Sequence, residues 1–218
     1  MDIIFKNKDF VVINKAPLVP SQKDLSGDAD AMSQTSEILK AEGESHKLWL
    51  IHRLDRVVGG LLVFARNEKS AAALSQMVAS GNLFKGYLAV VEGEAQGGEL
   101  CDYLYKDSMT NKAYVVKALR KGAKEARLSY EPISFKDGKT LVDIELKTGR
   151  FHQIRAQFSS RKMPLVGDKK YGSRDGKSKH PALFAYKLAF SLFGKDYSFE
   201  ARPDFSIYPW NLFSEEMK

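Results

Sequence analysis

Short apolar and β-branched runs alternate with polar turns along most of this chain, and this pattern predicts strands. In the N-terminal third the runs occupy residues 3–5, 10–14, 48–51 and 61–65. Further along they occupy residues 87–91, 100–105, 113–118, 126–135, 140–146, 183–190 and 197–201. Asp137-Gly138 indicates a hairpin and Gly194-Lys195-Asp196 a second turn.

Three segments have helical spacing instead, at residues 31–42, 68–80 and 151–161. The expected end signals are Ser26, Asp28 or Asp30 with Gly43 for the first helix, Asn67 with Gly81 for the second, and Pro164 beyond the third. Many strands in sequence with few helices predict an α+β fold built on one large, mostly antiparallel sheet. The chain shows no repeat and no obvious linker, so a single domain over residues 1–218 is expected.

Composition sets the broad class of protein. A chain of 218 residues with 44% apolar residues can bury a substantial core. No apolar run approaches the length of a bilayer span, and the N-terminus lacks the pattern of a signal peptide, so no membrane partner is expected. The single cysteine, Cys101, excludes an internal disulfide and favours a cytoplasmic location.

Positive charge is concentrated in two segments of a chain whose net charge is +7. Residues 106–127 hold seven Lys or Arg against two acids, and residues 169–180 hold five against Asp175 alone. Such segments suit the phosphates of a nucleic acid, although a merely soluble cationic surface would look the same.

The most informative loop is His52-Arg53-Leu54-Asp55-Arg56, which lies between two apolar runs and is followed by Gly59 and Gly60. Asp55 is its only carboxylate, and the flanking arginines should keep it ionised. An ordinary surface loop with one salt bridge is the alternative. The four histidines and Cys101 lack the paired spacing of metal ligands, and no phosphate-binding glycine motif is present. We therefore expect neither a metal nor a nucleotide cofactor.

The predicted helix 151–161 offers a second set of polar groups. Phe151, Ile154 and Phe158 would form its apolar face. His152 and Arg155 would share the neighbouring face, and Arg150 just precedes the helix. An arginine held there could pair with a carboxylate or a phosphate. The alternative is a helix whose cations face solvent.

Taken together, these stretches resemble the RluA-type RNA pseudouridine synthases. The resemblance rests on FVVINKAP (10–17), HRLD (52–55), LLVFARN (61–67), KGYLAVVEG (85–93), TGRFHQIRAQF (148–158) and PLVGDKKYG (164–172), in this order. It implies the pseudouridine-synthase fold, a large mixed sheet flanked by helices with a central catalytic cleft. It also implies isomerisation of uridine to pseudouridine in rRNA or tRNA without a cofactor. We expect the protein to be a monomer.

The resemblance also implies roles for individual residues. Asp55 would be the essential aspartate, either the nucleophile at C1′ or the base at C2′. Tyr87 would stack on the target base, and Arg155 would pair with the aspartate. The residues expected to contact substrate are Lys15, His52, Arg53, Arg56, Arg150, His152 and Ile154.

Three positions depart from the family pattern. The usual R-x-T-S-G is Arg56-Val57-Val58-Gly59-Gly60 here, and two histidines of the family are replaced by Gln157 and Phe184. The first of these changes, at Val58-Gly59, leaves open a non-catalytic RNA-binding or ribosome-assembly factor with the same fold. A nucleoside hydrolase is disfavoured, because a glycosidase needs two carboxylates and this loop has one. No S4-like RNA-binding domain is expected, so the catalytic domain itself would recognise RNA.

Overall fold

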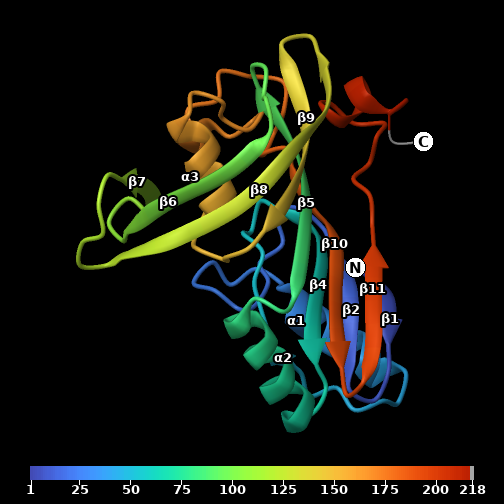
Figure 1. Ribbon diagram of the computed structural model, residues 1–218. Coiled ribbons are helices and arrows are strands. Elements are labelled where there is room, and N and C mark those ends of the chain that lie inside the picture. Colours follow the sequence, from blue (N-terminus) through green and yellow to red (C-terminus); the bar gives the residue numbers. More distant parts are fainter. Residues whose placement is uncertain (217–218) are drawn as a thin grey trace. The chain divides into compact units, whose positions relative to one another are not determined.

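The computed structural model describes residues 1–216, which divide into two compact units. The first unit comprises Met1–Lys85 and Ala185–Pro203. The second comprises Gly86–Phe184 and the described residues that follow Pro203. Each unit has its own helices and strands (Figure 1).

The first unit is built on a mixed sheet. Its strands are β1 (Asp2–Lys6), β2 (Phe10–Lys15), β3 (Trp49–Leu50), β4 (Gly59–Ala65), β10 (Leu183–Leu192) and β11 (Lys195–Glu200). The order is β1-β2-β4-β10, with β11 paired to β10 and β3 to β4. The pairs β1–β2, β2–β4, β3–β4 and β10–β11 are antiparallel, whereas the arrows of β4 and β10 run the same way in Figure 1.

Glycine is required where β4 begins beside β10. Gly60 has a φ of +116°, and a β-carbon there would lie 2.2 Å from the carbonyl oxygen of Ala185. This close approach lets β4 lie against β10 directly after the Asp55 loop. Every residue of β4 is buried, as its unbroken apolar run predicts.

Both helices of this unit have the predicted caps. The Asp30 side chain accepts a hydrogen bond from the amide of Ser33 at the start of α1 (Ala31–Ala41). Asn67 does the same for Ser70 in α2 (Glu68–Ser80), which ends at Gly81 in the left-handed conformation. Helix α2 covers the core of the sheet, which includes Phe10, Val12, Leu61, Val63, Leu74, Leu188 and Phe190.

Replacing Asn67 tests how far this cap fixes α2. Its side chain accepts from the amide and the hydroxyl of Ser70, and its amide donates to Lys8 and Asp9 in the β1–β2 turn. We expect Asn67→Ala to lower the free energy of unfolding by about 1–2 kcal/mol in urea denaturation. Asn82→Ala, in an exposed residue beyond the same helix, should change it little; equal effects would contradict the cap's role.

The second unit is built on an antiparallel sheet in the order β5-β9-β8-β6-β7. Its strands are β5 (Phe84–Glu92), β6 (Gly98–Asp107), β7 (Lys112–Val116), β8 (Ala123–Lys136) and β9 (Lys139–Leu146). Helix α3 (Gln153–Ser160) packs against β6, β7 and β8 through Ala156, beside Leu104, Ala113 and Ala126. Two short 3₁₀ turns follow, η1 (Lys169–Tyr171) and η2 (Trp210–Phe213).

The α+β fold class is confirmed, and three local predictions need correction. Helix α3 begins at Gln153 rather than residue 151, because His152 has a φ of +52° and lies outside the helix. The β10–β11 turn is centred on Phe193 and Gly194, since Leu192 already pairs with Lys195. The predicted buried strand at 48–51 is only the two-residue, half-buried β3.

Candidate active site

The Asp55 loop is held by hydrogen bonds to the segment that follows β2. The Ser21 hydroxyl donates to the carbonyl of Leu54 at 2.9 Å and accepts from the Leu54 amide at 3.0 Å. The Val58 amide donates to the Asp55 carbonyl at 3.0 Å, which closes a turn over the next three residues. Asp55 itself is half-buried. The backbone on both sides of this carboxylate is therefore held in place.

Lys15 is a fully buried cation in the same unit. Its ammonium donates to the carbonyls of Val19 at 2.7 Å, Ala16 at 3.0 Å and Arg56 at 3.3 Å. Burial lowers the pKa of Lys15 to about 8, and the Asp55 carboxylate opposes this shift. Lys15 is therefore still mostly protonated at neutral pH, and it ties the Asp55 loop to residues 16–19.

The departures from the family's R-x-T-S-G pattern are accommodated by packing. Val58 is 2% exposed, so this apolar side chain occupies a buried position. A β-carbon at Gly59 would lie 3.0 Å from Pro17 Cδ and 3.2 Å from the Lys15 carbonyl oxygen, which leaves little room for a side chain. The altered loop is thus tightly packed against residues 15–17.

The arginines that flank Asp55 are both exposed. Arg56 forms an ion pair with Asp28 and donates through Nε to the Leu18 carbonyl at 3.1 Å. Arg56 therefore anchors the irregular segment between β2 and α1, a contact that the sequence did not predict.

His52 is a neutral imidazole at physiological pH. Burial, and secondly the charge of Lys85, lowers the pKa of His52 from 6.5 to about 3. Its Nε2 atom accepts a long hydrogen bond, 3.4 Å, from the Val63 amide of β4. His52 therefore packs against β4 without carrying charge.

This neutral histidine predicts acid sensitivity. The folded-state pKa of His52 lies below the ordinary value of 6.5, so the folded protein binds fewer protons than the unfolded chain in the window down to about pH 3. Stability is therefore lost as the pH falls through that window. We expect the melting temperature to drop between about pH 7 and about pH 5, and to drop less in His52→Gln. An unchanged pH dependence in His52→Gln would contradict this, with exposed His46→Gln as the control.

In the second unit Arg155 is held by a buried ion pair. Its Nε and Nη2 atoms donate to the two carboxylate oxygens of Asp168 at 2.7 and 2.8 Å. The side chains of Arg155 and Asp168 are 6% and 1% exposed. The alternative in which the cations of this helix merely face solvent is therefore wrong for Arg155. Its predicted pairing with Asp55 stays a prediction.

Tyr171 joins Arg155 to the neighbouring hairpin. The guanidinium of Arg155 lies 4.9 Å from the centre of the Tyr171 ring, close enough for a cation–π interaction. The Tyr171 hydroxyl accepts from the Ala113 amide of β7 at 2.8 Å and lies 2.9 Å from His152 Nδ1. Tyr171 thus links Arg155 of helix α3, His152 just before that helix, and strand β7.

The pKa of His152 is lowered by burial, as is that of His52. Burial, and then the charges of Arg155, Lys170 and Lys106, lowers the pKa of His152 to about 3. Its ring is stacked on Phe151 with centroids 3.8 Å apart. Because both residues precede α3, neither lies on the helix face that the spacing predicted.

The remaining predicted residues of this unit differ in exposure. Tyr87 on β5 is 6% exposed and Ile154 in α3 is 4% exposed. Arg150 is exposed, and its Nε donates to the Glu125 carbonyl at 2.8 Å. The predicted set therefore divides between the units. Lys15, His52, Arg53, Asp55 and Arg56 belong to the first unit, and Tyr87, Arg150, His152, Ile154 and Arg155 to the second.

Three polar residues around these groups received no role from the sequence. They are Ser21, Asp168 and Tyr171. Asp168 and Tyr171 lie in the PLVGDKKYG stretch, where an acid follows a buried apolar run and stands among lysines. Such an acid could have been recognised as a partner for a buried cation. No sequence signal marks Ser21.

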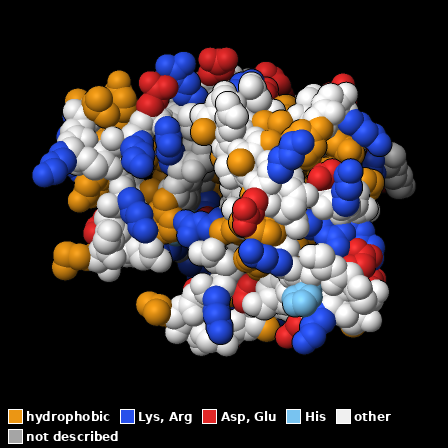
Figure 2. Space-filling model, turned by 90° about the horizontal axis from the view of Figure 1, so that it is seen from below, with side chains coloured by type: hydrophobic (Ala, Val, Ile, Leu, Met, Phe, Trp, Pro, Cys, Tyr) orange, Lys and Arg blue, Asp and Glu red, His pale blue; other side chains and the backbone are white. Residues whose placement is uncertain are grey.

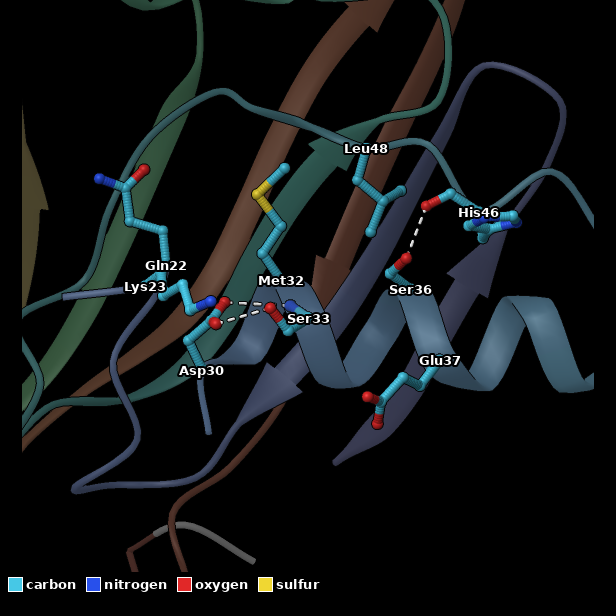
Figure 3. Close-up of a pocket in the computed structure, with 9 residues that line it drawn as sticks. All are labelled: Gln22, Lys23, Asp30, Met32, Ser33, Ser36, Glu37, His46 and Leu48. Carbon is cyan, nitrogen blue, oxygen red and sulfur yellow. Dashed lines mark hydrogen bonds between the residues drawn. The ribbon is translucent and has the colours of Figure 1, made fainter. Parts of the chain in front are cut away.

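A hollow of about 620 Å³ in the first unit involves other residues (Figure 3). It is lined by Gln22, Lys23, Asp30, Met32, Ser33, Ser36, Glu37, His46 and Leu48. Ser33 donates to the Asp30 carboxylate, and Ser36 donates to the His46 carbonyl. None of the predicted site residues lines this hollow.

The surface carries the expected positive charge. Lys and Arg side chains recur across the face shown in Figure 2. Six of the seven cations in residues 106–127 are exposed, and Arg120 and Lys106 lie 4.5 Å from the ring centres of Tyr105 and Phe151, respectively. Exposed cations beside aromatic rings are suited to single-stranded nucleic acid. Within residues 1–216, no helix is long and apolar enough to cross a membrane, and no cluster of three metal-ligating side chains occurs.

Comparison with known proteins identifies the class. Residues 9–160 match the family model described as RNA pseudouridylate synthase. Two human structures share the fold. RNA Pseudouridylate Synthase Domain Containing 1 gives a TM-score of 0.80 at 21% identity, over 96% of this chain and 85% of that one. Domain Containing 4 gives 0.79 at 20% identity, over 99% and 92%. The chain belongs to the RNA pseudouridine synthase family, whose members are isomerases.

Bacterial relatives are more similar in sequence. An uncharacterized RNA pseudouridine synthase of Haemophilus influenzae is 27% identical, over 87% of this chain and 82% of the relative. The tRNA pseudouridine synthase C of Vibrio parahaemolyticus is 30% identical, over 84% and 77%. The ribosomal large subunit pseudouridine synthase D of Borreliella burgdorferi is 28% identical over 87% of this chain, which spans 61% of that relative.

Proposed function

We propose that this protein isomerises uridine to pseudouridine within rRNA or tRNA, with Asp55 as its catalytic aspartate. The main support for this proposal is the structural environment of the Asp55 carboxylate. It is a half-buried carboxylate in a loop fixed by Ser21 and by the buried cation Lys15. A protonated Lys15 nearby favours the ionised form of Asp55, the form that can act as nucleophile or base.

The reaction needs no external oxidant or reductant. The N1–C1′ bond breaks, the uracil turns, and a C5–C1′ bond forms, while the hydrogen at C5 leaves as a proton and N1 gains one. Asp55 either attacks C1′ or removes a proton at C2′. Tyr87 stacks on the extruded base against Ile154, as is common where an enzyme acts on a nucleotide removed from a helix.

The distribution of charge and the named relatives support the proposed substrate class. The two basic segments would bind the phosphates on either side of the uridine. Relatives named for tRNA and for the large ribosomal subunit support structured RNA as the proposed substrate. We expect the enzyme to act as a monomer in the cytoplasm. The ammonium of Lys15 donates to three backbone carbonyls, so Lys15 would act by holding the loop.

The proposal is tested by mapping pseudouridine in RNA. Total RNA from a strain that lacks this gene is incubated with the purified protein, and every pseudouridine is located before and after. One or a few new sites would support the proposal and identify the RNA. RNA binding without any new site would favour the second candidate, a non-catalytic RNA-binding factor, which the Val58-Gly59 departure alone suggests.

A further inference from the structure

A loop of exposed cations in the second unit is held by many hydrogen bonds, although its like charges should repel one another. Residues 169–180 contain Lys169, Lys170, Arg174, Lys177 and Lys179, all exposed, with Asp175 as the only acid. Like charges in one segment repel and favour extended conformations. This loop nevertheless has a defined path, so attachments elsewhere must hold it.

The first attachment is Glu92 at the end of β5. One of its carboxylate oxygens, Oε1, accepts three hydrogen bonds from the loop. The donors are the Ser173 hydroxyl at 2.5 Å, the Arg174 amide at 3.1 Å and the Asp175 amide at 3.3 Å. Hydrogen bonds to a charged acceptor are stronger than neutral ones. Glu92 therefore fixes the backbone on both sides of Arg174.

Further attachments surround the same point. The Ser173 hydroxyl also accepts from the Gly167 amide at 3.0 Å. Asp175 accepts from the amides of Lys177 at 2.9 Å and Ser178 at 3.0 Å, and the Tyr208 hydroxyl donates to its other oxygen. The loop is thus tied to β5 through Glu92 and to the C-terminal segment through Tyr208.

We propose that Glu92 is a positioning residue that holds this basic loop in the shape in which it binds RNA phosphates. The inference rests on the proposed function for the identity of the ligand. A loop that is already ordered loses less conformational entropy when it binds. A larger share of the free energy of each phosphate contact then contributes to affinity. Glu92 acts through the loop, since a carboxylate close to a phosphate would repel it.

A purely electrostatic effect and a positioning effect predict opposite changes in RNA affinity for Glu92→Ala. Removing an acid beside a basic loop raises the net charge by one, and electrostatics alone would tighten RNA binding. Positioning predicts weaker binding instead, with Kd and KM raised about fivefold and kcat unchanged. The slope of log Kd against log salt should also become shallower by about one, because one cation no longer reaches its phosphate.

Two matched variants separate the loop from the charge. Glu92→Gln keeps an acceptor oxygen, so most of the affinity should return. Glu94→Ala removes an exposed acid two residues away, and its affinity should equal or exceed that of the wild type. Thermal unfolding of each variant shows that it is folded. Kd is measured with the structured RNA that the wild type modifies, or with total tRNA if no modified site is found.

Tighter or unchanged RNA binding by folded Glu92→Ala would overturn the inference. So would a fall in kcat with KM unchanged, since that would assign Glu92 to the chemistry. Because Kd is measured without turnover, this result is independent of whether pseudouridine forms. Failure of the loop inference and failure of the proposed function are therefore distinguishable.

Discussion

The Asp55→Asn variant is expected to bind RNA as tightly as the wild type and to form no measurable pseudouridine. Asparagine has nearly the same shape, so the hydrogen bonds of Ser21 and Val58 to the loop backbone should remain. It cannot act as a nucleophile or as a base, however, and the rate should fall by about a thousandfold or more. Single-turnover formation of pseudouridine and RNA affinity are the two measurements.

Asp2→Asn supplies the matched control, since it makes the same chemical change at an exposed position of β1. It should retain full activity. If Asp55→Asn kept more than about a tenth of the wild-type rate, the role of Asp55 as nucleophile or base would be contradicted. If it lost RNA binding as well, the defect would lie in the loop and not in the chemistry.

The Asp168→Asn variant is expected to lose both stability and activity. It removes one partner of a pair whose side chains are 6% and 1% exposed, and Arg155 would keep a buried charge opposite a neutral amide. Breaking a buried pair in this way costs about 3–5 kcal/mol of folding free energy. Urea denaturation measures this loss. Glu125→Gln, which breaks the exposed pair with Arg127, should have little effect.

A double variant separates the structural part from the functional part of this effect. Arg155→Met with Asp168→Leu replaces the pair by apolar side chains and should recover much of the stability. Activity should stay absent, because the proposal assigns Arg155 to the catalytic group. Recovered activity in the double variant would show that Arg155 serves folding alone.

Features of the fold that depend on neighbouring residues were predictable from the sequence. Helix α2 has the expected caps because Asn67 and Gly81 act within one turn of the helix. The β8–β9 hairpin also forms as expected, since Asp137 and Gly138 have the positive φ values that a two-residue turn requires.

Features that depend on distant residues were not predictable in this way. Helical spacing places His152 and Arg155 on one face, but His152 adopts a left-handed conformation and sits beside Tyr171. Arg155 is buried because Asp168, thirteen residues later and beyond Pro164, supplies the opposite charge. Periodicity carries no information about such a partner.

The candidate site shows the same division. Asp55 and Arg155 could be proposed as candidates from motifs, because the family resemblance marks them directly. The supporting contacts of Ser21 and Lys15 were not, since a hydroxyl or an ammonium that bonds backbone carbonyls leaves no sequence pattern. The replacement of the family's Thr-Ser pair by Val58-Gly59 became interpretable only when the packing against Pro17 was known.

Release of tritium from RNA labelled at C5 of uridine shows whether this chain isomerises uridine. Each isomerisation replaces the C5–H bond by a C5–C1′ bond, so the tritium must pass to water. The base itself stays attached to the RNA. We expect tritium in water with the wild type, none with Asp55→Asn, and no free uracil with either. Free uracil would indicate hydrolysis, and RNA binding without tritium release would contradict the claim that this chain is an active pseudouridine synthase.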